Sequence, residues 1–143
     1  MQRFALGLGL LFATLSPLAT AAEAPKVFAD VEVKVANADI EKKGAGIRTL
    51  FITLYNEASQ APMPYGALKI ELTADAKGTV YKGKLDTTNV MIMGGTDMPK
   101  TLRIKARLDK DGSAGTDAAG DLVGNATGVK PGSKVAISID KAL

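Results

Sequence analysis

Apolar and polar residues alternate with a period of two along several short stretches of the chain. In FADVEVKV, residues 28–35, valines alternate with a glutamate and a lysine. The same alternation occurs in residues 65–72, 79–85, 100–108 and 134–139. A period of two places the apolar side chains on one face of a strand and the polar side chains on the other. These stretches therefore predict β-strands with one buried face each.

Two further stretches are apolar without a clean alternation. Residues 48–55, RTLFITLY, are rich in β-branched and aromatic side chains and predict a central strand. Residues 90–93, VMIM, form a short apolar segment. No segment after the N-terminal apolar run has a convincing helical period, and the polar residues 36–46 are expected to form a connection. We therefore expect an all-β sandwich of two antiparallel sheets with about seven strands.

The N-terminal residues have a different pattern. Arg3 precedes an apolar run of roughly 17 residues, which is short for a membrane span. The run ends in Ala19-Thr20-Ala21, which fits the small-x-small rule for signal peptidase. We expect residues 1–21 to be a cleavable signal peptide and residues 22–143 to be one domain in the periplasm, with no permanent membrane span. The alternative is an uncleaved N-terminal anchor.

The composition narrows the chemistry that the chain can perform. Its 143 residues contain no cysteine and no histidine. Disulfides, Ser-His-Asp and Cys-His catalysis, and metal ligation by imidazole are therefore excluded. The formal net charge is only +3, and the basic residues are interspersed with acidic ones, so nothing supports nucleic-acid binding. We expect a protein that is not an enzyme and that holds no cofactor.

An aspartate-rich stretch raises the question of a metal site. Residues 109–113 read DKDGS, and D-x-D-G is typical of calcium loops. The twelfth position counted from Asp109 is Gly120, where an EF-hand needs a glutamate. Aspartate and glycine are also common in tight turns, and we favour that interpretation. Asp117 and Asp121 could form a carboxylate pair for hydrolysis, which is the weakest hypothesis because a Gly/Ala-rich loop holds such a pair poorly.

The methionines offer a second metal hypothesis. Thioethers bind Cu(I), so a copper site could use four methionines without cysteine or histidine. Its ligands would be Met63, Met91, Met93 and Met98. We favour the simpler interpretation that Met91 and Met93 face inward and fill gaps in the core.

Several short segments carry a resemblance to a known family. In chain order they are APMP (61–64), LD (85–86) followed by Met91 and Met93, ARLDKDGSA (106–114), GDLVG (120–124), VKPG (129–132) and ID (139–140). In this order the chain resembles the C-terminal periplasmic domain of the cytochrome c-type biogenesis protein CcmI, also called CycH. The resemblance spans residues 27–141, and its two longest motifs are fairly specific in combination.

The resemblance implies an immunoglobulin-like sandwich in which ARLDKDGSA ends one strand and GDLVG begins the next. It also implies a non-catalytic protein-binding or assembly role accessory to cytochrome c-type biogenesis. The partners would be haem-lyase or other cytochrome c maturation components, or apocytochrome c. Docking is expected at a sheet edge or at the surface formed by Pro62, Met63, Pro64 and Tyr65. The alternative is a periplasmic copper-binding protein that uses the four methionines.

Overall fold

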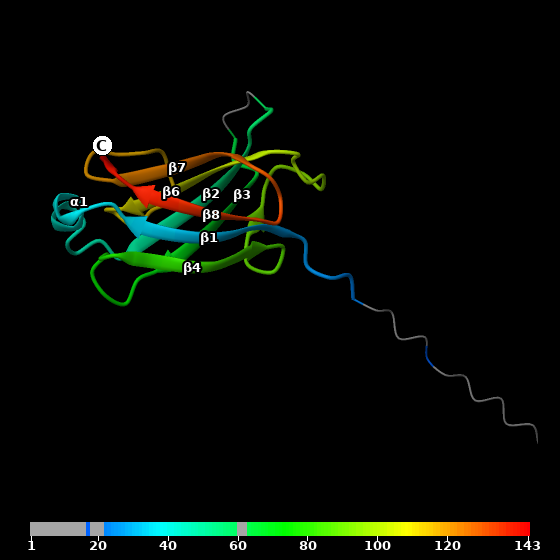
Figure 1. Cartoon of the computed structure of the whole chain (residues 1–143), viewed down its shortest axis with the longest axis horizontal. Helices are drawn as coiled ribbons and strands as arrows, with labels where there is room; N and C mark the ends of the chain where they lie inside the picture. Colours follow the sequence, from blue (N-terminus) through cyan, green and yellow to red (C-terminus); the bar gives the residue numbers. More distant parts are fainter. Residues whose placement is uncertain (1–16, 18–21, 60–62) are drawn as a thin grey trace, which may run out of the picture.

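A computed structural model describes Pro17, residues 22–59 and residues 63–143 of the chain. The predicted signal peptide, residues 1–21, lies outside these residues except for Pro17. Within the described part, the chain forms two β-sheets and one short helix (Figure 1). No helix in this part is long and apolar enough to cross a membrane.

Seven strands have six or more residues, and two strands have two residues each. In chain order they are β1 (Val27–Val35), β2 (Thr49–Asn56), β3 (Gly66–Glu71), β4 (Thr79–Asp86), β5 (Met91–Ile92), β6 (Leu102–Asp109), β7 (Leu122–Val129), β8 (Ser133–Ile139) and β9 (Lys141–Ala142). The predicted all-β sandwich of about seven strands is confirmed. The expected central position of residues 48–55 is also confirmed, because β2 lies in the middle of its sheet.

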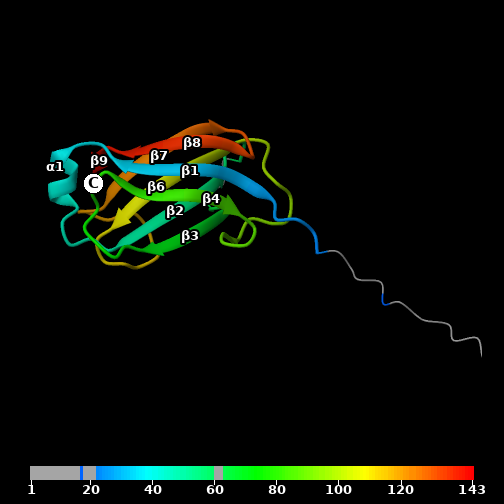
Figure 2. The same cartoon turned by 60° about the horizontal axis from the view of Figure 1, so that its bottom comes forward.

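The strands are divided between a small sheet and a large sheet (Figure 2). The small sheet has the order β4-β1-β8, and the large sheet has the order β5-β3-β2-β6-β7-β9. One pairing departs from the expected antiparallel arrangement, because β1 runs parallel to β8. β8 continues through Asp140 into β9, which pairs with β7, so the end of the chain passes from the small sheet to the large one.

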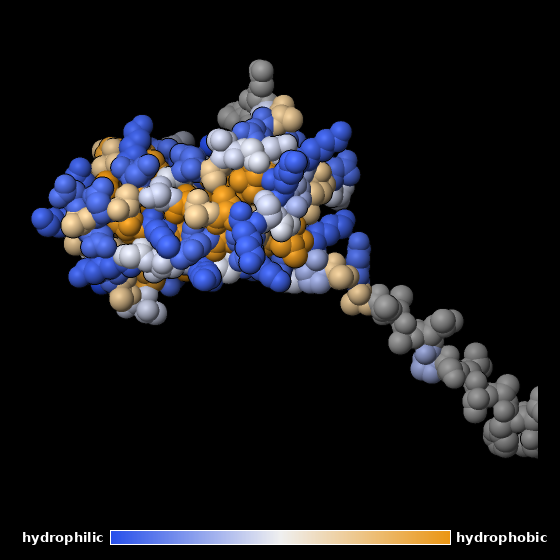
Figure 3. All heavy atoms as spheres, in the orientation of Figure 1, coloured by the Kyte–Doolittle hydropathy of each residue, from blue (hydrophilic) through white to orange (hydrophobic). Residues whose placement is uncertain are grey.

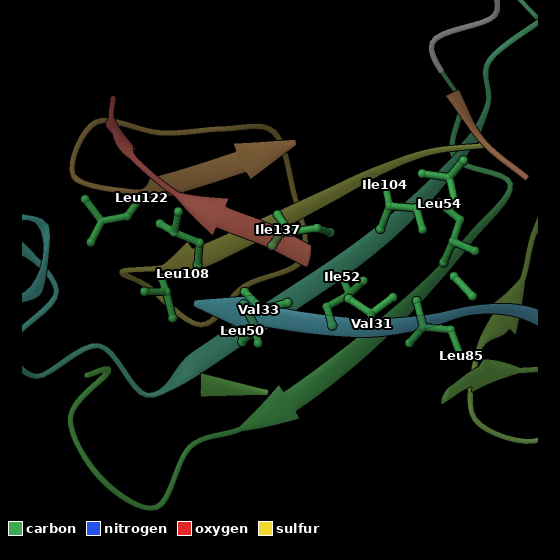
Figure 4. Close-up of a cluster of buried hydrophobic side chains, with 14 of the residues drawn as sticks. Val31, Val33, Leu50, Ile52, Leu54, Leu85, Ile104, Leu108, Leu122 and Ile137 are labelled. Atoms are coloured by element: carbon green, nitrogen blue, oxygen red, sulfur yellow. The ribbon is translucent and has the colours of Figure 1, made fainter. Parts of the chain in front are cut away.

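Alternating side chains of both sheets form one core. Val31 and Val33 of β1 face Leu50 and Ile52 of β2 across the sandwich (Figure 4), and none of the four is more than 1 % exposed. The other residues of β2 and β6 point to the opposite side of the large sheet, as a period of two requires. Because one face of the large sheet packs against the small sheet, the large sheet has a second, outer face.

The expectation that residues 36–46 form only a connection is wrong, because they contain the helix α1 (Ala38–Lys43). The Asn37 side chain caps this helix by accepting hydrogen bonds from the Asp39 and Ile40 backbone N–H groups, each at 3.1 Å. Ile40 is its one buried side chain. A helix of six residues with one buried side chain is too short to show a helical period. The sequence pattern therefore does not reveal α1.

Candidate binding face

The outer face of the small sheet carries alternating charges. Asp30 of β1 lies between Lys84 and Lys134 on the neighbouring strands, and Glu32 lies opposite Lys82. Hydrophilic side chains are spread over this side of the molecule, with smaller apolar areas between them (Figure 3). Opposite charges on adjacent strands neutralise one another, and this arrangement is typical of a solvated face.

The outer face of the large sheet has a different composition. β6 presents Arg103, Lys105 and Arg107 outward, as the alternation in residues 100–108 predicts, and β2 presents Phe51 and Tyr55 beside them. The guanidinium of Arg103 lies 4.0 Å from the centre of the Tyr55 ring. The guanidinium of Arg107 lies 5.2 Å from the centre of the Phe51 ring. These cation–π contacts hold both aromatic rings in place on the outer face of the sheet, where Tyr55 is partly exposed and Phe51 is buried.

The Arg107 side chain holds the loop between β6 and β7 against the outer face of the large sheet. Its Nη2 lies 2.9 Å from Asp109 Oδ2, and its Nη1 lies 3.1 Å from Asp117 Oδ1. Nη1 also donates to the Gly115 carbonyl oxygen at 2.8 Å. The Arg107 side chain is only 10 % exposed, and Asp121 Oδ2 lies 3.9 Å from its Nε, which has no hydrogen-bond partner in the part of the chain that the structure describes. The guanidinium is therefore the centre around which the loop is arranged.

The aspartates of this loop mainly hold the backbone. Asp109 Oδ1 accepts from the Gly112 N–H and Asp111 Oδ1 from the Ser113 N–H, each at 2.8 Å. Asp121 accepts from the N–H groups of Lys110 and Ala118. Among the described residues, no three or more acidic side chains are grouped so that they could hold a metal ion. These contacts agree with the favoured interpretation of residues 109–113 as a turn.

Asp117 and Asp121 both lie beside the Arg107 guanidinium, and each carboxylate also has partners of its own. Asp117 pairs with Lys105 and Arg107 and is partly exposed. Asp121 is 1 % exposed, and its two oxygens accept from different backbone groups. Both carboxylates of the hydrolysis hypothesis therefore make contacts that hold the loop in its conformation.

The surroundings of the loop shift the pKa values of Asp109 and Asp117 in opposite directions. Burial raises the pKa of Asp109, and a hydrogen bond with Asp111 and the charge of Asp121 add to this effect. The hydrogen bond from the Lys105 ammonium lowers the pKa of Asp117, and the hydrogen bond from Arg107 lowers it further. Asp117 therefore favours folding in its ionised form, whereas ionised Asp109 depends on Arg107 for compensation.

We predict that Asp117→Asn destabilises the protein at neutral pH and not in strong acid. The pKa of Asp117 is lower in the folded than in the unfolded state, so its stabilisation is present above the unfolded pKa and is lost as the pH falls through the folded pKa. Because solvent screens the exposed part of the carboxylate, we expect a loss of about 1 kcal/mol at pH 7. Urea unfolding across the acid range measures it, and a difference that stays constant with pH would contradict this account.

The methionines are placed differently from the favoured expectation. Met91 is 72 % exposed and Met93 is 45 % exposed, so the interpretation of these two side chains as core is wrong. They lie on and just after β5, a two-residue edge strand that pairs only with the beginning of β3. Met63, nearby in the chain before β3, is 69 % exposed. Met98 is partly buried and packs against the core.

The predicted docking surface at residues 62–65 is only partly at the surface. Pro62 lies outside the described residues, Met63 is exposed, and Pro64 is half-buried. Tyr65 is 6 % exposed and packs edge to face on Phe28, with ring centres 5.7 Å apart. Its side chain therefore anchors this loop to the core and is not available to a partner.

A groove with a volume of about 490 Å³ crosses the outer face of the large sheet. Phe51, Thr53 and Tyr55 of β2 and Ala67 of β3 are among the residues that line it. On one side it is bounded by Pro64, Met91 and Met93, and on the other by Lys105, Arg107 and residues 114, 115 and 117 of the loop. The groove thus combines aromatic rings, flexible thioethers and cations. Lys69 also lines the groove. From here on, "the binding face" means all the residues that line the groove together with Arg103 and Met63.

No protein-family model matches the chain, and comparisons with curated proteins and with solved structures likewise found no match. The resemblance to the CcmI domain therefore stays a prediction. The sequence did not single out the aromatic part of the binding face, because the apolar stretch 48–55 looks buried on both sides. The outward row of Arg103, Lys105 and Arg107 opposite it is the signal that could have indicated an amphipathic face.

Proposed function

We propose that the protein is a non-catalytic periplasmic binding protein that holds a protein partner on the binding face. The observation that carries the proposal is the clustering of exposed apolar side chains. Of the described residues, five are large, apolar and exposed. Met63, Met91 and Met93 lie at the β5 end of the large sheet, whereas Ile92, next to Met91 on β5, lines a separate hollow with Phe28 and Tyr65. Leu143, the remaining one, lies at the other end near α1 (Figure 1). Exposed apolar clusters of this kind mark interaction sites.

The residue types of the binding face support a protein partner. Methionine, tyrosine, phenylalanine and arginine are enriched in protein interfaces, and tyrosine and arginine dominate the residues that contribute most to affinity. Arg103 over Tyr55 and Arg107 over Phe51 are held before any partner arrives. A rigid, prearranged surface loses less conformational entropy on binding than a mobile one.

The resemblance to the CcmI domain supports a role accessory to cytochrome c-type biogenesis. The first partners to test are therefore apocytochrome c and the haem-lyase components. The expected signal peptide supports the periplasm as the compartment.

We predict that Met91→Glu lowers binding of purified apocytochrome c by about tenfold, because it places a charge in the centre of the apolar cluster. Ser138→Glu is the matched control, since it adds the same charge at an exposed position of β8 on the small sheet. Surface plasmon resonance with the immobilised protein measures both variants. Equal binding by the two variants would show that the binding face is not the site. Absence of binding to apocytochrome c and to haem-lyase components would contradict the proposed role.

Copper binding is the second candidate, and the exposure of Met63, Met91 and Met93 at one end of the sheet favours it. Solvent-accessible thioethers can reach Cu(I), whereas core methionines cannot. Anaerobic titration with Cu(I) tests this candidate. Met91→Ile with Met93→Ile should abolish the binding, and unchanged binding would remove the proposed ligands.

A further inference from the structure

The groove is polarised along its length, and this polarity constrains what can occupy it. Register places Lys69 and Arg107 on either side of Phe51, at one end of the groove. Register also places Ala67 and Lys105 on either side of Thr53, in the middle, with Met91 beyond Ala67. At the far end lies Tyr55. Pro64 and Met93 belong to this end, because Met93 donates its N–H to the carbonyl of Tyr65, beside Pro64.

The length of the groove suits a short extended chain. Its floor follows β2 from Phe51 to Tyr55, which are four residue steps apart. At about 3.3 Å per residue, this span is about 13 Å. An extended peptide of about four to five residues would therefore lie along it, with side chains over Thr53 and Tyr55 and one end beside Phe51, which is only 6 % exposed.

The charges that line the groove are unequal. Lys69, Lys105 and Arg107 are cationic, and Asp117 is the one carboxylate among the lining residues. Lys105 and Arg107 are already compensated, because Asp117 pairs with both and Asp109 also pairs with Arg107. Lys69 has a different partner, Glu71, at 2.9 Å, and both side chains are at least half exposed. Such a surface pair is weak, so the Lys69 ammonium is available to an incoming anion.

Resting on the proposed protein-binding function, we propose that the groove takes an extended peptide segment with apolar side chains at one end and an acidic side chain at the other. The apolar side chains lie against Tyr55, Met91 and Met93, where the thioethers adapt to their shapes. The acidic side chain lies at the Phe51 end, beside Lys69. A basic residue at that position would be repelled, so the binding face selects its partner by charge as well as by apolar contact.

The test uses fluorescence anisotropy with three labelled hexapeptides and the full domain. Each peptide has four alternating leucines and methionines, and they end in two aspartates, two asparagines or two lysines. We expect the aspartate peptide to bind about fivefold more tightly than the asparagine peptide, as one exposed charge contact would give, and the lysine peptide to bind least. Lys69→Glu should reverse the order of the aspartate and lysine peptides. Lys134→Glu, the same charge change on the outer face of the small sheet, should not.

Two results would overturn the inference and leave the proposed function standing. One is equal affinity for the three peptides while apocytochrome c still binds in a manner sensitive to Met91→Glu. The other is binding of laurate, a fatty-acid anion, by the groove with no binding of any peptide, while apocytochrome c still binds in a manner sensitive to Met91→Glu. Loss of both peptide and protein binding from the wild-type domain would contradict the inference and the proposed function together.

Discussion

Replacing Arg107 with leucine is expected to lower the free energy of unfolding by about 3–5 kcal/mol, because removing one partner leaves buried charges uncompensated. Asp109 is 3 % exposed and Asp121 is 1 % exposed, and both lie beside the guanidinium. The loop that carries Asp117 also loses its contacts with Arg107 and keeps only the Lys105–Asp117 pair among the ion pairs that attach it to β6. Urea unfolding at pH 7, followed by far-ultraviolet circular dichroism, measures the loss.

The matched control for this prediction is Arg103→Leu. Arg103 lies on the same face of the same strand and contacts the Tyr55 ring, so its loss should cost about 1 kcal/mol or less. Asp109→Asn introduced together with Arg107→Leu should recover part of the stability, since it removes one of the uncompensated carboxylates. Equal effects of Arg107→Leu and Arg103→Leu would contradict the central role of Arg107.

The effect of Arg107→Leu should also depend on pH. The pKa of Asp109 is already raised in the folded state by burial, and without Arg107 it should rise further. A group whose folded pKa is raised stabilises the fold below its unfolded pKa, and that stabilisation is lost as the pH rises through the folded pKa. The variant should therefore lie closer to the wild type at pH 4 than at pH 7.

Gly124→Ala is expected to prevent stable folding or to cost more than about 3 kcal/mol, which is the range of severe overpacking. A Cβ at Gly124 would lie 2.0 Å from the Ser138 carbonyl oxygen and 2.7 Å from its carbon. Both are backbone atoms of β8, so no change of side-chain rotamer can make room. β7 and β8 would have to move apart where the chain passes from one sheet to the other.

Gly115→Ala provides the comparison for Gly124→Ala. Nothing lies within 4 Å of a Cβ built at Gly115, so we expect a change within about 0.5 kcal/mol. Thermal unfolding of the two variants, with the yield of soluble protein, distinguishes them. A wild-type midpoint for Gly124→Ala would show that the two strands are not in close contact at this point.

Strands with clean alternation could be predicted from the sequence, because the core selects one face of each. β7 was not revealed by this pattern: its central residues are Gly124, Asn125, Thr127 and Gly128, which are poor strand formers or lack an apolar side chain. Only the family resemblance predicts that β7 begins within residues 120–124. Its position is determined by backbone pairing with β6 and by close contact with β8, which local composition does not report.

The candidate site was predictable only in part. The outward direction of Arg103, Lys105 and Arg107 follows from a period of two, and the structure agrees. The exposure of Met91 and Met93 could not be predicted, because the same apolar letters describe a core segment and an edge strand with one neighbour. The arrangement of the loop around Arg107 depends on residues that are distant along the chain, so no local pattern contains it.

The position of β1 between β4 and β8 has a consequence for how the molecule acquires its structure. β1 pairs with β8, which ends at Ile139. The small sheet therefore cannot be complete until nearly the whole polypeptide is available. Closing so long a loop is entropically costly, and topologies dominated by such distant pairings fold slowly. A nascent chain would therefore stay unstructured, and deleting the last dozen residues should yield no domain at all instead of a shorter one.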